Sequence, residues 1–154
     1  MDHDVEYDVF SSTCPSRPVL EDVTGRWGAL ALGALADGPL RFNALRRHVQ
    51  GVSQKMLAQS LQALERDGLV KREVQSTFPL QVEYSLTPTG EVLATKLLDL
   101  IAYLRGSMPG IVEAQQSYDK ARAQADKARA QTDKAHAQTD KARAAQADKA
   151  HAQA

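Results

Sequence analysis

Apolar side chains recur with a helical period near the middle of the chain. Leu57, Leu61 and Leu64 are spaced at i, i+4 and i+7, so they share one face of a helix. The opposite face is polar and comprises Gln54 in the first turn, then Lys55, Gln59, Gln62 and Arg66. Ser53 is the candidate N-cap, and Asp67-Gly68 ends the segment. The pattern predicts an amphipathic helix that exposes amides and cations.

Shorter elements precede this helix. Proline suits the first turn of a helix, and Pro18 is followed by the apolar Leu20 and Val23. Glycine and proline at 38–39 stop the second helix, and Asn43 is the candidate cap of the third. The expected bounds are 18–24 and 27–35 for the first two helices, 40–42 for a brief extended piece and 44–49 for the third helix.

Two strands and a last helix follow. The candidate strands cover 69–75 and 82–87, and they form a hairpin whose loop is too long for a two-residue turn. Thr87-Pro88 opens the last helix, and Gly106 and Pro109 are expected to end it. One stripe of this helix is apolar and comprises Leu93, Leu97, Leu100, Ile101 and Leu104.

The order of these elements predicts the fold class. Helix, helix, short strand, helix, helix, hairpin and helix describe a winged helix-turn-helix, mainly α with a small β-hairpin wing. The polar side chains of the amphipathic helix can reach base edges and phosphates, because this helix directly follows a helix and a turn. The same side chains are also ordinary for a solvated helix surface, and this alternative stays open.

Charge is distributed unevenly, although the 154 residues contain 19 Lys plus Arg and 19 Asp plus Glu. Residues 41–72 contain seven basic and two acidic side chains, a net charge of +5. A local basic stretch of this kind is typical of a phosphate-binding surface, although a solvated surface also fits it. The seven cations are Arg41, Arg46, Arg47, Lys55, Arg66, Lys71 and Arg72.

Composition divides the chain into four segments. Residues 1–13 are acidic and predict a flexible arm, and 14–108 contain nearly all the leucine, valine and aromatic side chains. Residues 109–118 are expected to be a linker. From 119 to 154 a DKARAQA-type heptad occurs five times, which predicts an alanine-rich tail that is helical or disordered. Alanine buries little apolar area, so any coiled coil there would be loose.

Several classes of protein are set aside. The longest apolar run, 28–36, is too short to span a membrane, and the chain opens on acidic residues rather than on a secretory signal. A single cysteine permits no disulfide within the chain, which fits the cytoplasm. The sequence contains no dinucleotide-binding fingerprint, P-loop or zinc-protease motif, so we expect no enzyme, no cofactor and no metal site.

Six short segments of the chain form a characteristic series: Cys14-Pro15, Gly25 to Trp27, Gly38 to Arg46, Ser53 to Leu57, Leu64 to Val70 and Val82 to Gly90. Together they resemble the HxlR-type bacterial transcriptional regulators, which are winged-helix dimers related to the MarR group. The resemblance covers about residues 14–105. It implies a homodimer that binds double-stranded operator DNA, usually as a repressor.

The resemblance also implies which residues contact DNA. It places 53–62 in the major groove as the recognition helix, and makes 71–83 the wing. At the position before Val-Glu-Tyr, where family members usually have arginine, this chain has Gln81, so the wing tip is uncharged. The DNA-binding residues expected on this basis are Arg41, Asn43, Arg46, Ser53, Gln54, Lys55, Gln59, Lys71 and Arg72.

Cys14 matches the N-terminal cysteine with which several HxlR-type proteins sense oxidants or electrophiles. A thiolate is favoured near a helix N-terminus and by a cation, here Arg17. The alternative is a small buried side chain that packs in a dimer interface.

Two other functions stay open at this point. One is a regulator that responds to a small-molecule inducer rather than to an oxidant. The other is a protein-interaction module in which the tail is a coiled-coil arm.

Overall fold

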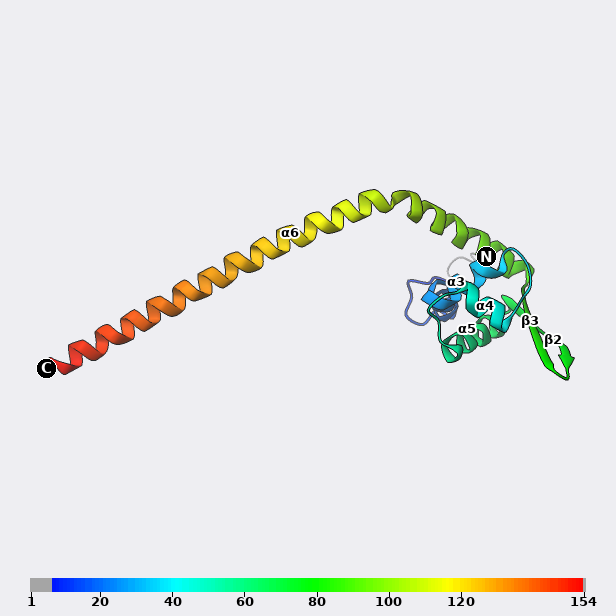
Figure 1. Ribbon diagram of the computed structural model, residues 1–154, viewed down its shortest axis with the longest axis horizontal. Helices are drawn as coiled ribbons and strands as arrows, with labels where there is room; N and C mark the ends of the chain where they lie inside the picture. Colours follow the sequence, from blue (N-terminus) through cyan, green and yellow to red (C-terminus); the bar gives the residue numbers. More distant parts are fainter. Residues whose placement is uncertain (1–6, 154) are drawn as a thin grey trace. The chain divides into compact units, whose positions relative to one another are not determined.

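The computed structural model describes residues 7–153, and its elements follow the predicted order (Figure 1). The expectation for the arm at 1–13 falls partly on residues 1–6, which lie outside the described residues. The fold is a winged helix-turn-helix that is mainly α with a small antiparallel sheet, as predicted, and its C-terminal helix is longer than expected. The elements are α2 (Ser16–Thr24), α3 (Arg26–Leu35), β1 (Leu40–Arg41), α4 (Phe42–His48), α5 (Gln54–Arg66), β2 (Val70–Thr77), β3 (Leu80–Leu86) and α6 (Pro88–Ala152).

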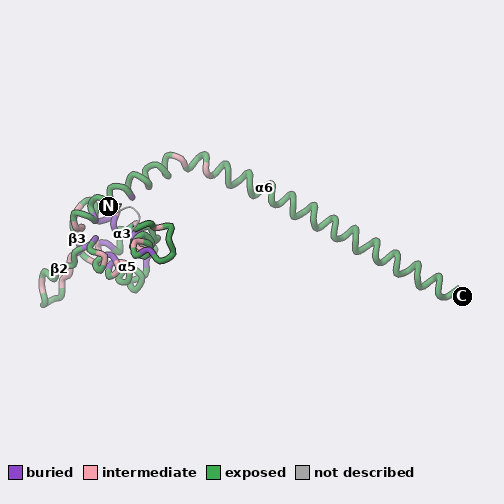
Figure 2. The backbone as a smooth tube through the Cα atoms, turned by 180° about the vertical axis from the view of Figure 1, so that it is seen from behind, coloured by how far each residue is buried: buried purple, intermediate pink, exposed green. Residues whose placement is uncertain are grey.

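The apolar face of α5 is the centre of the hydrophobic core. Leu57, Leu61 and Leu64 are fully buried, as the spacing predicted. They pack in one cluster with side chains from α3 and α4, among them Leu32 and Leu45. Figure 2 shows the buried residues gathered around α3 and α5. Burying one leucine stabilises the fold by about 1.5–3 kcal/mol, so this face fixes how α5 is oriented.

The predicted cap of α5 is confirmed and that of α4 is wrong. The Met56 backbone N–H donates to Ser53 Oγ over 3.1 Å. Asn43 caps nothing, because α4 begins at Phe42 and its N-cap is Arg41, which makes no side-chain cap hydrogen bond. The reason is the short strand β1, whose Arg41 pairs with Glu83 of β3. That pairing keeps Arg41 extended, so the helix begins at the next residue.

The hairpin is longer and its connection shorter than predicted. The three-stranded antiparallel sheet has the order β1-β3-β2, and β2 pairs with β3 up to Thr77 and Leu80. Only Phe78 and Pro79 connect the two strands, so the expectation of a longer loop is wrong. A bulge between Val74 and Ser76 shifts the register, and pairing continues beyond it.

The C-terminal helix continues where the sequence predicted an end. Gly106 and Pro109 lie inside α6, and residues 109–118 are helical rather than a linker. A proline removes one N–H donor and crowds the carbonyl four residues earlier, and the next residues, 110–112, are poor helix formers. The helix nevertheless continues into the alanine-rich repeat from 119, which favours helix strongly. None of residues 105–153 is buried (Figure 2). The tail is therefore helical, without a side-chain core of its own.

The start of α6 is held tightly against the beginning of the hairpin. Thr87 Oγ1 donates to the Gly68 carbonyl over 2.7 Å and accepts from the Gly90 N–H over 3.1 Å. A Cβ on Gly90 would lie 2.0 Å from the Leu69 carbonyl oxygen, so only glycine fits there. The wing and the last helix are therefore joined by a close backbone contact.

Asp67, at the C-terminal end of α5, is a half-buried acidic residue. Its Oδ2 is buried and has no hydrogen-bond partner among the described residues. Burial, and then the Asp22 carboxyl of α2, raise the pKa of Asp67, while Arg66 partly opposes the shift. A raised pKa in the folded state means that stability is lost as pH rises through that pKa.

We expect Asp67→Asn to raise the free energy of unfolding at pH 7 by roughly 1 kcal/mol. The asparagine side chain is uncharged, so the variant has no buried carboxylate that lacks a hydrogen-bond partner. The gain should shrink as the pH falls toward 3, where the wild-type carboxyl is protonated. Thermal unfolding at both pH values measures this. Asp37→Asn, on an exposed turn, is the control. A lower midpoint for Asp67→Asn at pH 7 would show that the carboxylate stabilises the fold.

Candidate nucleic-acid interface

The turn between α4 and α5 brings cations to the N-terminus of α5. Gly51 has φ +86° in this turn, a conformation that favours glycine. The resulting hollow is lined by two arginines together with the cap of α5 and the turn itself. Its residues are Asn43, Arg46, Arg47, Gly51, Val52 and Ser53. The structure therefore brings together three residues predicted to bind DNA: Asn43, Arg46 and Ser53.

A second hollow lies between α4, the start of α5 and the wing. Arg41, Asn43 and Gln54, all predicted to bind DNA, share it with the wing residue Gln81. The remaining lining residues are Phe42, Ala44, Arg47, Leu80 and Val82. The wing, the first turn of α4 and the first turn of α5 are thus walls of one groove.

Arg47 is the residue that the sequence prediction of the site missed. It is exposed and lines both hollows. Its spacing was an available signal, because it follows Asn43 by four residues and so lies on the same face of α4. Together with Arg41 and Arg46 it gives the two hollows three cations.

The exposed face of α5 is free to make contacts. Ser53, Gln54, Lys55 and Gln59 are all exposed, opposite the buried leucines. The first backbone N–H groups of a helix and its dipole favour an anion at this end. Within residues 7–153, no carboxylate oxygen lies within 4.0 Å of the side-chain nitrogens of Lys55 or the three arginines of the hollows. Their charge is therefore available to phosphate.

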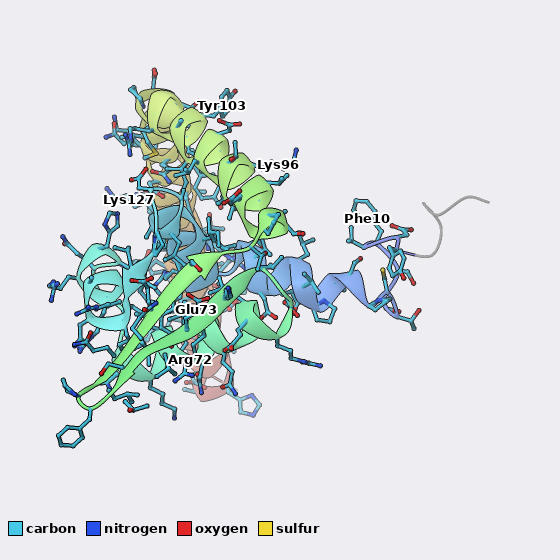
Figure 3. All side chains as sticks on the ribbon, turned by 90° about the vertical axis from the view of Figure 1, so that its right-hand side faces the viewer. Phe10, Arg72, Glu73, Lys96, Tyr103 and Lys127 are labelled. Atoms are coloured by element: carbon cyan, nitrogen blue, oxygen red, sulfur yellow. The ribbon has the colours of Figure 1, made fainter. Side chains whose placement is uncertain are left out.

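The two cations at the base of the wing lie elsewhere. Lys71 pairs with Glu73 on the same strand, with 2.5 Å between Nζ and Oε1. Arg72 lies beside Glu73 on β2 (Figure 3), and lines a separate hollow with Gln62 and Glu65 of α5. Lys71 and Arg72 are exposed, but the structure does not bring them to the hollows of α4.

Cys14 is buried just before α2, within a short hydrogen-bonded chain. Its Sγ lies 2.9 Å from Ser16 Oγ, and Ser16 Oγ donates to the Tyr7 carbonyl over 3.1 Å. A hydroxyl has a single hydrogen, so with Ser16 donating to Tyr7 the thiol is the donor to Ser16. Among residues 7–153, no group of three or more His, Cys, Asp and Glu side chains is placed to hold a metal ion.

The fold is that of winged helix-turn-helix regulators of transcription, and the matching family and its relatives are such regulators rather than enzymes. The HxlR-like helix-turn-helix family matches residues 22–110, and the chain belongs to this family. The resemblance noted from the sequence is thereby confirmed. No helix in the described part of the chain is both long and apolar enough to cross a bilayer.

Three known proteins illustrate the similarity. The uncharacterized HTH-type transcriptional regulator YtfH of Escherichia coli (strain K12) is 50% identical over 107 residues, which are 70% of this chain and 85% of the relative. A solved structure of ytfH from Salmonella typhimurium has a TM-score of 0.69 and 49% identity, covering 72% of this chain and 99% of the other. The redox regulator HypR in its oxidized form has a TM-score of 0.55 and 36% identity, covering 60% and 96%.

We expect Arg46→Ala, Arg47→Ala and Lys55→Ala each to weaken DNA binding and to lower the salt slope by about one, because each removes a phosphate contact. Binding isotherms at several salt concentrations measure both. Lys96→Ala, an exposed cation on α6 (Figure 3), is the matched control. If the three variants had the same salt slope as Lys96→Ala, neither the two hollows nor Lys55 would contact phosphate.

Gln54→Ala and Gln59→Ala should act differently, because amides read adenine edges rather than phosphate. We expect an unchanged salt slope and a relaxed sequence preference. Selection of duplexes from a random pool by each variant measures this. Selected sequences identical to those of the wild type would remove these amides from base recognition.

Proposed function

We propose that this protein is a sequence-specific repressor that binds operator DNA as a homodimer in the cytoplasm. The observation that carries the proposal is the set of exposed cations and amides around the N-terminus of α5. Arg46 and Arg47 lie beside the cap Ser53, and Gln54 faces the wing across one groove. Specific binding requires two kinds of contact, which are cations against the DNA phosphates and polar groups such as amides against the base edges.

The apolar surface of the globular part supports a dimer. Within α2 and the first part of α6, several large apolar side chains are exposed, including Leu20, Val92, Leu100, Tyr103 and Leu104. Exposed large apolar side chains of this kind are typical of an interface with a second copy. A two-fold dimer presents two recognition helices, which would bind half-sites about one DNA turn apart. The tail, outside the family match, has no part in this proposed contact.

The test joins two measurements on the full chain. Light scattering at micromolar concentration should give a dimer, and selection from a random-sequence pool should recover a site with two-fold symmetry. A gel shift with DNA upstream of the protein's own gene then asks whether that site occurs there. A monomer, or a pool with no enriched sequence, would contradict the proposal. If the pool gives an enriched sequence but the protein does not bind the DNA upstream of its own gene, only regulation of that gene is contradicted.

We also propose that Cys14 senses oxidants or electrophiles. The similarity to HypR, a redox regulator, supports this. The geometry supports it as well. Reaction at Sγ removes the thiol hydrogen, so the hydrogen bond from Cys14 to Ser16 Oγ would be lost.

The reactions at this thiol differ between reagents. With a quinone, an S–C bond forms and the thiol proton passes to the quinone oxygen. With diamide, two thiols form an S–S bond between subunits while the reagent takes up both hydrogens. Either product would disturb the start of α2, at the proposed interface.

Cys14→Ser should bind the selected duplex as the wild type does, but should not be released by quinones, hypochlorite or diamide. Serine is close in size and cannot react in this way. Gel shifts with and without oxidant measure release, and non-reducing electrophoresis detects a linked dimer. Equal release of wild type and Cys14→Ser would leave Cys14 as a packing residue.

A regulator that responds to a small ligand is the second candidate. It is favoured by a mostly apolar hollow between α3, the end of α4 and the first part of α6, whose lining includes Leu30, Ala34, His48, Leu98 and Ile101. Release of DNA by an added small molecule, equal for wild type and Cys14→Ser, would support this candidate.

A further inference from the structure

Helix α6 carries a heptad pattern that begins in the globular part and continues into the tail. Uncharged side chains occur at alternating intervals of four and three residues, without a break, from Leu93 to Ala142. This spacing places them along a single stripe of a helix, which is the pattern of a left-handed coiled coil. We call the members of this series from Ser107 to Ala142, beginning with 107, 111, 114 and 118, the tail seam.

Within one protomer the tail seam is uncovered, because none of its side chains is buried. Two of its members are threonines, whose hydroxyls bond within their own helix. Thr132 Oγ1 donates to the Ala128 carbonyl over 3.0 Å, and Thr139 Oγ1 donates to the Ala135 carbonyl over 2.9 Å. These hydroxyls already have acceptors, so the seam requires no polar partner.

The proline inside α6 does not interrupt the series. Pro109 falls five residues after Leu104 and two before Ile111, both members of the series. With about 100° of rotation per residue, Pro109 lies on the side of the helix opposite to them. The N–H that proline lacks would have bonded to the carbonyl of Arg105, which is also outside the series.

The side chains that flank the tail seam distinguish the two ways in which two copies could pair. Arginine or histidine follows the seam at 122, 129 and 136, and glutamine precedes it at 124, 131 and 138. In a parallel pair these two flanks oppose each other, so each cation lies opposite an uncharged amide of the other copy. In an antiparallel pair each flank opposes itself, so arginine would lie opposite arginine. Like charges repel, which favours the parallel pair.

The cations of the tail do not form a surface suited to DNA. Lys127 and Arg129 lie on nearly opposite sides of the helix, and Asp126 lies between them. The DKARAQA-type repeat gives a similar arrangement in the neighbouring heptads. A nucleic-acid surface gathers its cations on one side, so this arrangement favours a second copy over a nucleic acid.

We propose that the tail seam pairs with the same segment of a second copy as a parallel two-stranded coiled coil. This contact is separate from the one between the globular parts, but it rests on the proposed homodimer. Alanine buries little apolar area, so the two tails pair because the dimer holds them at a high effective concentration. The pairing ends near Ala142, because an additional alanine in the fourth repeat shifts the series by one position.

The test compares two cysteines in the full chain carrying Cys14→Ser. Ala128→Cys places a thiol in the tail seam, and Ala130→Cys places one on the outer side; both alanines are exposed. Diamide takes up two hydrogens as an S–S bond forms between the subunits. We expect the linked dimer to form about ten-fold faster from position 128, because a disulfide needs Cα atoms within about 7 Å. Non-reducing electrophoresis over time measures both rates.

A second comparison depends on a gain. Ala150→Cys in the same background lies one position outside the series, because of the additional alanine, and should be linked slowly. Deleting Ala145 restores the intervals of four and three up to this position. The rate of linkage at position 150 should then rise to that of Ala128→Cys.

Equal rates from positions 128 and 130 would overturn the coiled coil, and so would an unchanged rate at position 150 after deletion of Ala145. A protein that is dimeric by light scattering and selects a symmetric site would retain its proposed function after either result. A monomeric full chain would overturn both the proposed function and the coiled coil.

Discussion

The site depends on the burial of one helix face. Leu57, Leu61 and Leu64 fill the core beneath α5, each removed from water completely or nearly so. Burial of this size cannot be given up without unfolding the domain, so the rotation of α5 about its own axis is fixed. The polar side chains at 54, 55 and 59 then face solvent because the leucines face the core. The exposed polar face of α5 is thus a consequence of this packing.

Two further constraints build the groove around that helix. The positive φ of Gly51 allows a tight turn, which brings Arg46 and Arg47 of α4 beside Ser53. Pairing of Arg41 with Glu83 attaches the start of α4 to β3, which brings the wing to the same groove. Local positive charge therefore arises in a chain whose formal net charge is zero. The acidic residues that balance it lie in other segments, so averaging over the chain hides the basic surface.

The local sequence predicted those features that interactions between near neighbours decide. The leucine period, the Ser53 cap and the order of elements all depend on residues within a few positions of one another, and all are confirmed. It failed where distant pairing decides. Asn43 does not cap α4 because a strand far along the chain fixes Arg41, and the hairpin connection is short because a bulge lets pairing resume. Pro109 lies inside α6 although Gly110 and the β-branched Ile111 and Val112 follow it, so local propensity gave no signal for this continuation. The contacts of the site residues with DNA are still predictions.

The proposed function requires that α5 lie in the major groove of a symmetric operator. The single native cysteine makes a direct measurement possible, because a Cys14→Ser background carrying Gln62→Cys offers one thiol for an iron–EDTA reagent that cleaves nearby sugars. Gln62 is exposed on α5 and is not one of the residues proposed to contact DNA. On the selected duplex we predict two clusters of cleavage, with centres about one helical turn apart. The same reagent at Lys96→Cys, on α6, gives the background. Cleavage from position 62 that is spread evenly along the duplex, or that matches the pattern from position 96, would contradict the proposed function.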